Sequence, residues 1–168
     1  MYTDGTVTKD HLDEKTYNEA ILLLKAGGNY NAPAELLKPV IWEQSISQFF
    51  IQQGYGLQFD KGVDVRLMKI AKEKGLEIRE VESGIFQFQM LSGYSDGLQA
   101  SLLESTLAAD SMEYYAEVAD LYEKWCAGDE AVLREAVLDD LSELTEDELA
   151  LYEEYNKAMI TDRNEGML

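Results

Sequence analysis

Apolar side chains recur every three or four residues along most of this chain, in segments that glycine interrupts. In residues 60–74, for example, Val63, Leu67 and Ile70 follow this spacing, and Gly75 comes directly after them. Such spacing places side chains on one face of a helix, and glycine ends a helix by adopting a left-handed conformation. We therefore predict a mainly helical fold. The same signals predict helices over residues 10–26 and 40–53, around 98–103, from Ser111 to Gly128, from Asp129 to about Leu138, and after a Thr145–Glu148 capping box.

Two segments show the pattern of β-strands instead. Residues 76–81 (LEIREV) alternate between apolar and polar side chains, which is typical of a strand with one buried face. Residues 1–7 contain an Asp4-Gly5 turn pair between β-prone residues, which favours a hairpin or a strand end. A helix followed at once by a strand is typical of mixed folds. The expected fold class is therefore α+β, mainly helical with one or two short strands.

The length of 168 residues and the 46% content of hydrophobic residues fit one globular domain, residues 1–168, with a core of its own. We expect the apolar stripe in the helix before Gly128 to face that core. This stripe consists of Tyr114, Val118, Leu121, Tyr122 and Trp125.

The charge balance excludes several classes of protein. The chain has 33 acidic and 14 basic residues, a formal net charge of −19, which repels phosphate backbones and argues against nucleic-acid binding. No apolar run is long enough to span a membrane. Acidic side chains, among them Asp4, Asp10, Asp13 and Glu14, occur throughout the first twenty residues, which does not fit a signal peptide. The compartment stays open, because one cysteine fits an oxidising or a reducing environment.

The acidic residues lie mainly in the second half of the chain. Residues 85–168 carry 20 acidic and 4 basic residues. Such a surface attracts cations or a basic partner, or it serves as a solvated face that keeps the protein soluble. The second interpretation is favoured, because no segment has the spacing of an EF-hand loop.

Few residues in the chain are suited to catalysis or metal binding. With one cysteine, Cys126, the chain has no internal disulfide and no cysteine-rich zinc site. His11, the only histidine, is expected to be a surface residue near a helix start rather than a base or a ligand. Glu82 follows the predicted strand, and strand ends often carry functional groups, although a solvated carboxylate is the competing interpretation. Arg163 is the last basic residue, and a salt bridge near a helix C-terminus is its competing interpretation.

Several segments, taken in order, resemble the central region of TraB/GumN-family proteins. They are LLKPVIWEQ (36–44), GVDVRLMKIAKEKG (62–75), EIREVES (77–83), QMLSGYSDGLQASLLESTL (89–107), WCAGDEAVL (125–133) and YNKAMITDRNEGM (155–167). The opening MYTDGTV is similar to a short hairpin that precedes this region in the family. Of these, the Gly-Val-Asp helix, the strand ending in glutamate and the Asp-Arg-Asn near the end are the most specific.

The resemblance implies a function and a site. The family includes proteins that inactivate peptide pheromones, and its animal relatives, the Tiki proteins, are metal-dependent proteases. The family's proposed active site consists of two GxxH motifs, a glutamate and an arginine, to which Glu82 and Arg163 are similar. Glu82 is then a candidate metal ligand of an incomplete site, and both residues are candidate catalytic residues. The sequence contains no GxxH motif.

The resemblance therefore leads us to expect the central helical portion of a larger α/β TraB-type domain, without the flanking GxxH segments. Such a portion would belong to a metal-dependent hydrolase or peptidase and be inactive alone. It would hold no cofactor itself, whereas a divalent metal is expected in a full-length parent, which could be exported or membrane-anchored. The side chains of Glu82 and Arg163 should converge on one pocket.

Two alternatives stay open from the sequence. One is a non-catalytic acidic helical module that binds a peptide or a basic protein, and the other is a structural piece without further activity. In either case a lone exposed strand invites pairing with another chain, so we expect a dimer or a domain swap.

Overall fold

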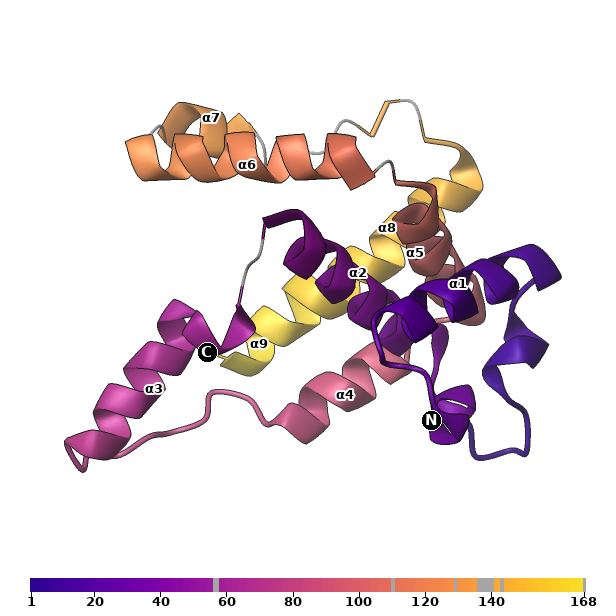
Figure 1. Ribbon diagram of the computed structural model, residues 1–168, viewed down its shortest axis with the longest axis horizontal. Coiled ribbons are helices and arrows are strands. Elements are labelled where there is room, and N and C mark those ends of the chain that lie inside the picture. Colours follow the sequence, from indigo (N-terminus) through magenta and orange to yellow (C-terminus); the bar gives the residue numbers. More distant parts are fainter. Residues whose placement is uncertain (56–57, 110, 129, 136–140, 143, 168) are drawn as a thin grey trace.

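The computed structural model describes residues 1–55, 58–109, 111–128, 130–135, 141–142 and 144–167. These residues form helices joined by short loops (Figure 1). None of the described helices is both long enough and apolar enough to cross a membrane. The elements are η1 (Thr8–His11), α1 (Glu14–Ala26), η2 (Ala32–Leu36), α2 (Pro39–Tyr55), η3 (Phe59–Lys61), α3 (Val63–Glu73), α4 (Gly84–Ser92), α5 (Asp96–Ala108), α6 (Ser111–Ala127), α7 (Glu130–Glu135), α8 (Glu146–Asn156), η4 (Lys157–Asp162) and α9 (Arg163–Met167).

The mainly helical fold is confirmed, whereas the predicted strands are wrong, because the described residues contain no strand. Residues 76–80 form neither a helix nor a paired strand, and residues 81–82 form a bend. Among the described residues, the backbone N–H groups of residues 77–82 donate to no backbone carbonyl. A strand exists only when a second strand pairs with it. The first residues form no hairpin either, since the backbone N–H of Tyr2 donates to the carbonyl oxygen of Leu36 at 2.9 Å.

Local signals at helix ends were predicted well. Pro39 is the first residue of α2, where its missing N–H is not needed. Gly75 and Gly128 have φ angles of +65° and +72° and end α3 and α6. The Thr145 side chain and the Glu148 side chain form the predicted capping box at the start of α8. Asp129, at which a further helix was predicted to start, lies outside the described residues.

Two boundaries differ from the prediction. The helix predicted over residues 10–26 is divided, because the Asp13 side chain accepts hydrogen bonds from the backbone N–H groups of Lys15 and Thr16 and starts α1 there. Helix α4 was not predicted, and it begins where the Ser83 hydroxyl oxygen accepts the backbone N–H of Phe86 at 3.1 Å. This unexpected helix forms one wall of the candidate site.

The core lies where α1, α2 and α5 pack together. Its buried residues are Ala20, Ile21, Leu24, Trp42, Ile46 and Leu103. A second buried cluster of Val40, Tyr94 and Leu98 packs against residues of α8 and η4, among them Tyr155 and Met159. The second cluster attaches the C-terminal helices to the core and so fixes the position of Arg163.

The apolar stripe of α6 does not face the core as predicted. Leu121, Tyr122 and Trp125 are exposed, with Trp125 at 61% of its full surface. The side chain of Tyr114 lies outside the part that the structure describes. Helical periodicity identifies an apolar face but not the segment that covers it, which explains the error.

Candidate functional site

The side chains of Glu82 and Arg163 meet, although 81 residues separate them in the sequence. Arg163 Nε donates to Oε1 and Oε2 of Glu82 at 2.9 and 2.8 Å, and Arg163 Nη2 also donates to Oε1. The Glu82 side chain is 10% exposed and the Arg163 side chain 27%. The structure thus brings the two predicted site residues together, while their catalytic role stays a prediction.

Local structure explains where each partner lies. Glu82 is at the end of the extended segment 76–82, next to the Ser83 cap of α4, and not at the end of a strand as predicted. Arg163 is the first residue of α9 and follows the π-helical turn η4. A π-helical turn changes the face on which the following residues emerge. The Arg163 guanidinium therefore depends on η4 for its direction toward Glu82.

Hydrogen bonds keep the Glu82 carboxyl group ionised and the Arg163 guanidinium protonated. Donation from Arg163, and next from Gln87, lowers the pKa of Glu82 below its usual value. The carboxylate in turn raises the pKa of Arg163. Glu82 is therefore ionised at neutral pH and holds no proton that a general acid could donate. In this arrangement the ion pair joins the segment before α4 to the first residue of α9.

The described residues do not fit a metal site. A catalytic zinc site uses three protein ligands and an open position. Among the residues that the structure describes, no three His, Cys, Asp or Glu side chains lie close enough to hold a metal ion. Glu82 is occupied by Arg163 and Gln87, and the only imidazole belongs to a separate network described below.

A groove of about 430 Å³ lies between α4 and the α8–η4 segment. Its lining residues are Phe86, Gln89, Met90, Gly93, Tyr94, Glu154, Lys157, Ala158 and Asp162. The ion pair lies next to it in the sequence, since Asp162 precedes Arg163 and Phe86 lies one helical turn beyond Glu82. The lining is mainly apolar, and its charged groups come from the α8–η4 side.

Polar contacts hold the two sides of this groove in place. The backbone N–H and the hydroxyl of Ser95 both donate to the Glu154 carboxylate, each at 2.6 Å. Lys157 and Asp162 form an ion pair along η4. The Tyr94 hydroxyl is buried without a hydrogen-bond partner among the described residues, and burial raises its pKa to about 12. Tyr94 therefore contributes a neutral phenol to the groove.

The groove residues were not predicted from the sequence. Phe86 and Met90 belong to α4, which showed no helical periodicity, and Tyr94 comes from the loop after it. The aromatic and apolar residues in QMLSGYSDG gave no sign of a shared pocket. The one feature of the sequence that could have pointed to these groove residues was their position between Glu82 and Ser95, the N-cap of α5.

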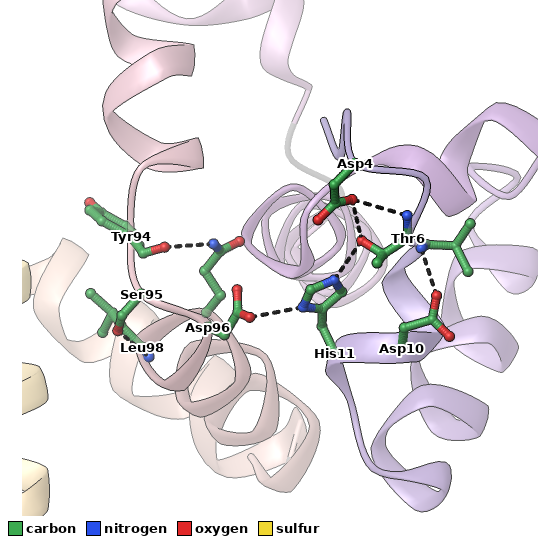
Figure 2. A network of polar contacts seen from close by, with 10 residues as sticks. Asp4, Thr6, Asp10, His11, Tyr94, Ser95, Asp96 and Leu98 are labelled. Carbon is green, nitrogen blue, oxygen red and sulfur yellow. Dashed lines mark hydrogen bonds and ion pairs between the residues drawn. The ribbon is translucent and has the colours of Figure 1, made fainter.

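His11 takes part in a network that ties the N-terminal segment to α5 (Figure 2). Its Nε2 lies 2.8 Å from Thr6 Oγ1, its Nδ1 lies 2.8 Å from Asp96 Oδ2, and its ring stacks on Tyr2 with the centroids 4.0 Å apart. The His11 side chain is only 18% exposed, so the prediction of a surface histidine is wrong.

The order Thr6, His11, Asp96 is that of a nucleophile, a base and an orienting acid, but the contacts oppose this use. The Thr6 hydroxyl donates to Asp4 Oδ1 at 2.6 Å (Figure 2). A nucleophile must donate that proton to the histidine instead. The network is therefore best described as a structural link between the first residues and the N-terminal end of α5.

Comparison with known proteins places the chain in a family. The model of the TraB/PrgY/gumN family matches residues 1–168, which is the whole chain. No significant match was found among curated protein sequences or among solved structures. A match over this length includes both Glu82 and Arg163 and every residue that lines the groove. The chain therefore belongs to the TraB/PrgY/gumN family.

Proposed function

We propose that this chain is the peptide-binding helical part of a TraB-type hydrolase, and that its described residues bind peptide without cleaving it. The observation that carries the proposal is the position of the groove. It lies between α4 and α8–η4, and the two residues that resemble the family's glutamate and arginine join these same elements. Peptide is the substrate class that the resemblance implies.

The size and lining of the groove support a peptide ligand. Pockets that hold small ligands have volumes of about 300–1,000 Å³ and mainly apolar walls with a few polar groups. The groove meets both conditions, with Phe86, Met90 and Ala158 as apolar lining. One or two apolar side chains of a peptide would fill it. The Lys157–Asp162 pair offers partners for peptide C=O and N–H groups.

Glu82 and Arg163 serve this function by positioning. Their ion pair connects the residue before the Ser83 cap of α4 to the first residue of α9, which directly follows η4. Helix α4 and the α8–η4 segment are the two sides of the groove. Because the described residues form no metal site, the proposal assigns binding to this chain and no bond cleavage. Metal-dependent hydrolysis would need further metal ligands in addition to the Glu82 carboxylate. We propose metal dependence only for a site in which those ligands are present.

Filling the groove should abolish peptide binding. Ala158→Trp places an indole among the lining residues, whereas Ala150→Trp adds the same side chain at an exposed position of α8 outside the groove. A fluorescein-labelled library of nine-residue peptides with an apolar central residue serves as the probe. We expect Ala158→Trp to weaken binding by about tenfold or more, and Ala150→Trp by less than about twofold, in fluorescence polarisation.

Two results would oppose the proposal. Equal binding by both variants, with unchanged circular dichroism, would remove the groove as the peptide site. Release of new peptide amino termini by the wild-type chain, with a divalent metal present or absent, would contradict the absence of cleavage.

A second candidate is the acidic binding module, and a hollow of about 520 Å³ between α1 and α5 favours it. Asp13, Glu19 and Glu104 line this hollow together with Lys15. A basic peptide held there would bind through exposed charges, which salt screens over about 10 Å at 0.1 M. Binding that disappears at high salt would favour this hollow, and binding that persists would favour the apolar groove.

A further inference from the structure

The extended segment between α3 and α4 leaves both its backbone and its apolar side chains uncovered. Leu76, Ile78 and Val81 are exposed. Among the described residues, the backbone N–H groups of residues 77–82 donate to no backbone carbonyl. A row of free N–H and C=O groups along an extended chain is a template for a second strand.

Both ends of this segment are fixed. At its start, the backbone N–H of Leu76 donates to the carbonyl oxygen of Ala71 at 2.9 Å, and Gly75 closes α3 with a φ angle of +65°. At its end, Glu82 is bound by Arg163. Figure 1 shows the segment as an extended link that runs beside no other element along most of its length. Pairing with a second strand would therefore lose little conformational entropy, because the segment is already extended.

The charges of the segment fit a second copy of itself. Glu77 and Arg79 lie on one face of the extended chain, where Arg79 Nε and Nη2 donate to Glu77 at 2.9 and 3.0 Å. If two copies pair antiparallel about Ile78, Glu77 of each copy lies opposite Arg79 of the other. The two-fold symmetry creates this contact twice and places Ile78 opposite itself.

Neighbouring registers lack this complementarity. A shift by one residue places Glu77 opposite Glu80 in one direction and opposite Ile78 in the other, so neither shift keeps the Glu77–Arg79 pair. A shift by two residues places Arg79 opposite Arg79 or Glu77 opposite Glu77, and like charges directly opposite each other are destabilising. A one-residue shift also changes the face on which each side chain emerges. The charge pattern thus selects the register centred on Ile78.

The wider charge distribution makes contact less unfavourable at this point than over the acidic remainder of the surface. The whole chain carries a net charge of −19, so two copies repel each other over most of their surfaces. Residues 61–79 are the exception, with six basic and three acidic residues. This region contains α3, whose Val63 and Leu67 are also exposed.

We propose that residues 76–80 are a self-association surface, through which two copies pair as antiparallel strands centred on Ile78. This interface is small, and an isolated two-stranded ribbon is only marginally stable. The dimer is therefore weak, and its population grows with protein concentration between about 10 µM and 1 mM.

Charge reversal tests the register on the full chain. Sedimentation velocity over this concentration range measures dimerisation of the wild type, Glu77→Arg and Arg79→Glu. Each single variant places like charges opposite each other and should weaken dimerisation by about tenfold or more. An equimolar mixture of the two variants should dimerise to within about threefold of the wild type, because opposite charges face each other again between copies. The mixture also distinguishes charge pairing between copies from loss of the Glu77–Arg79 ion pair within one chain. Mixing the variants can restore the pairing between copies, but it cannot restore the ion pair within either chain.

The outcomes decide the proposal. An amide I signal of paired strands that grows with concentration, together with recovery in the mixture, supports it. A wild type that stays monomeric at 1 mM overturns it, as does a mixture that associates no better than the single variants. A dimer that is unaffected by both reversals and does not dissociate on dilution also overturns it, because that behaviour is expected from exchanged helices. Circular dichroism of each variant verifies the helical fold.

Discussion

Replacing Trp42 with alanine is expected to lower the free energy of unfolding by about 3–5 kcal/mol. Trp42 is 1% exposed and belongs to the buried cluster that joins α1, α2 and α5. Its Nε1 donates to the carbonyl oxygen of Ala34 at 2.9 Å. Alanine would leave a cavity next to Ile46 and Leu103 and would also leave that buried oxygen without its donor.

The second tryptophan of the chain supplies the control. Trp125 is 61% exposed, so Trp125→Ala should change the free energy of unfolding by less than about 0.5 kcal/mol. Urea titration followed by far-ultraviolet circular dichroism measures both variants without depending on tryptophan fluorescence. If both variants lowered the free energy of unfolding equally, either Trp42 would not be a core residue or Trp125 would be buried rather than exposed.

Gln99→Glu is expected to destabilise the protein by about 2–4 kcal/mol at pH 7. The Gln99 side chain is fully buried, and its Nε2 donates to the carbonyl oxygen of Tyr94 at 2.8 Å. A carboxylate of the same shape brings a negative charge into this site and turns an oxygen toward that carbonyl. Burial and this contact both raise the pKa of the new carboxyl group in the folded state.

The raised pKa of this carboxyl group in the folded state determines how the stability of Gln99→Glu depends on pH. A carboxyl group whose pKa is higher in the folded than in the unfolded state gives stability below its unfolded value, about 4.3, and loses it as pH rises through the folded value. The deficit of Gln99→Glu relative to wild type at the same pH should therefore shrink between pH 7 and pH 4.5. Gln53→Glu, at an exposed position of α2, should show almost no deficit at either pH. A deficit that does not change with pH would mean that residue 99 is not buried.

Helix ends could be predicted because their causes are local. Pro39, Gly75 and the Thr145–Glu148 capping box each act through their own backbone or that of residues within one turn. Helix α4 was missed for the opposite reason. Its sequence GIFQFQMLS alternates between apolar and polar residues near its start, so it lacks the spacing of an amphipathic helix.

Strands and covered faces could not be predicted, because they depend on a second segment. Residues 76–81 have strand-like alternation, yet the described residues supply no partner. Trp125 lies on a regular apolar stripe, yet it is 61% exposed. In both cases the local pattern identifies an apolar face, but it does not determine whether another segment packs against that face.

The candidate site was predictable only in part. Glu82 and Arg163 were found through resemblance to a family, since neither residue lies in a catalytic motif of its own. The groove beside them depends on how α4 packs near α8, and the sequence spacing of Phe86, Tyr94 and Ala158 does not encode that arrangement. His11 gave a further error, because its partner Asp96 is 85 residues away.

The central claim is that Glu82 and Arg163 act as one unit that holds the groove in its peptide-binding form. A double-mutant cycle on peptide affinity, with Glu82→Gln, Arg163→Gln and the double variant, tests it most directly. We predict that each single variant weakens binding of the labelled peptides by about tenfold, because each leaves one charge of the pair without its partner. The double variant should bind no more weakly than either single variant. If the losses multiply instead, so that the double variant is weaker by about a hundredfold, or if no variant changes the affinity, the claim is contradicted.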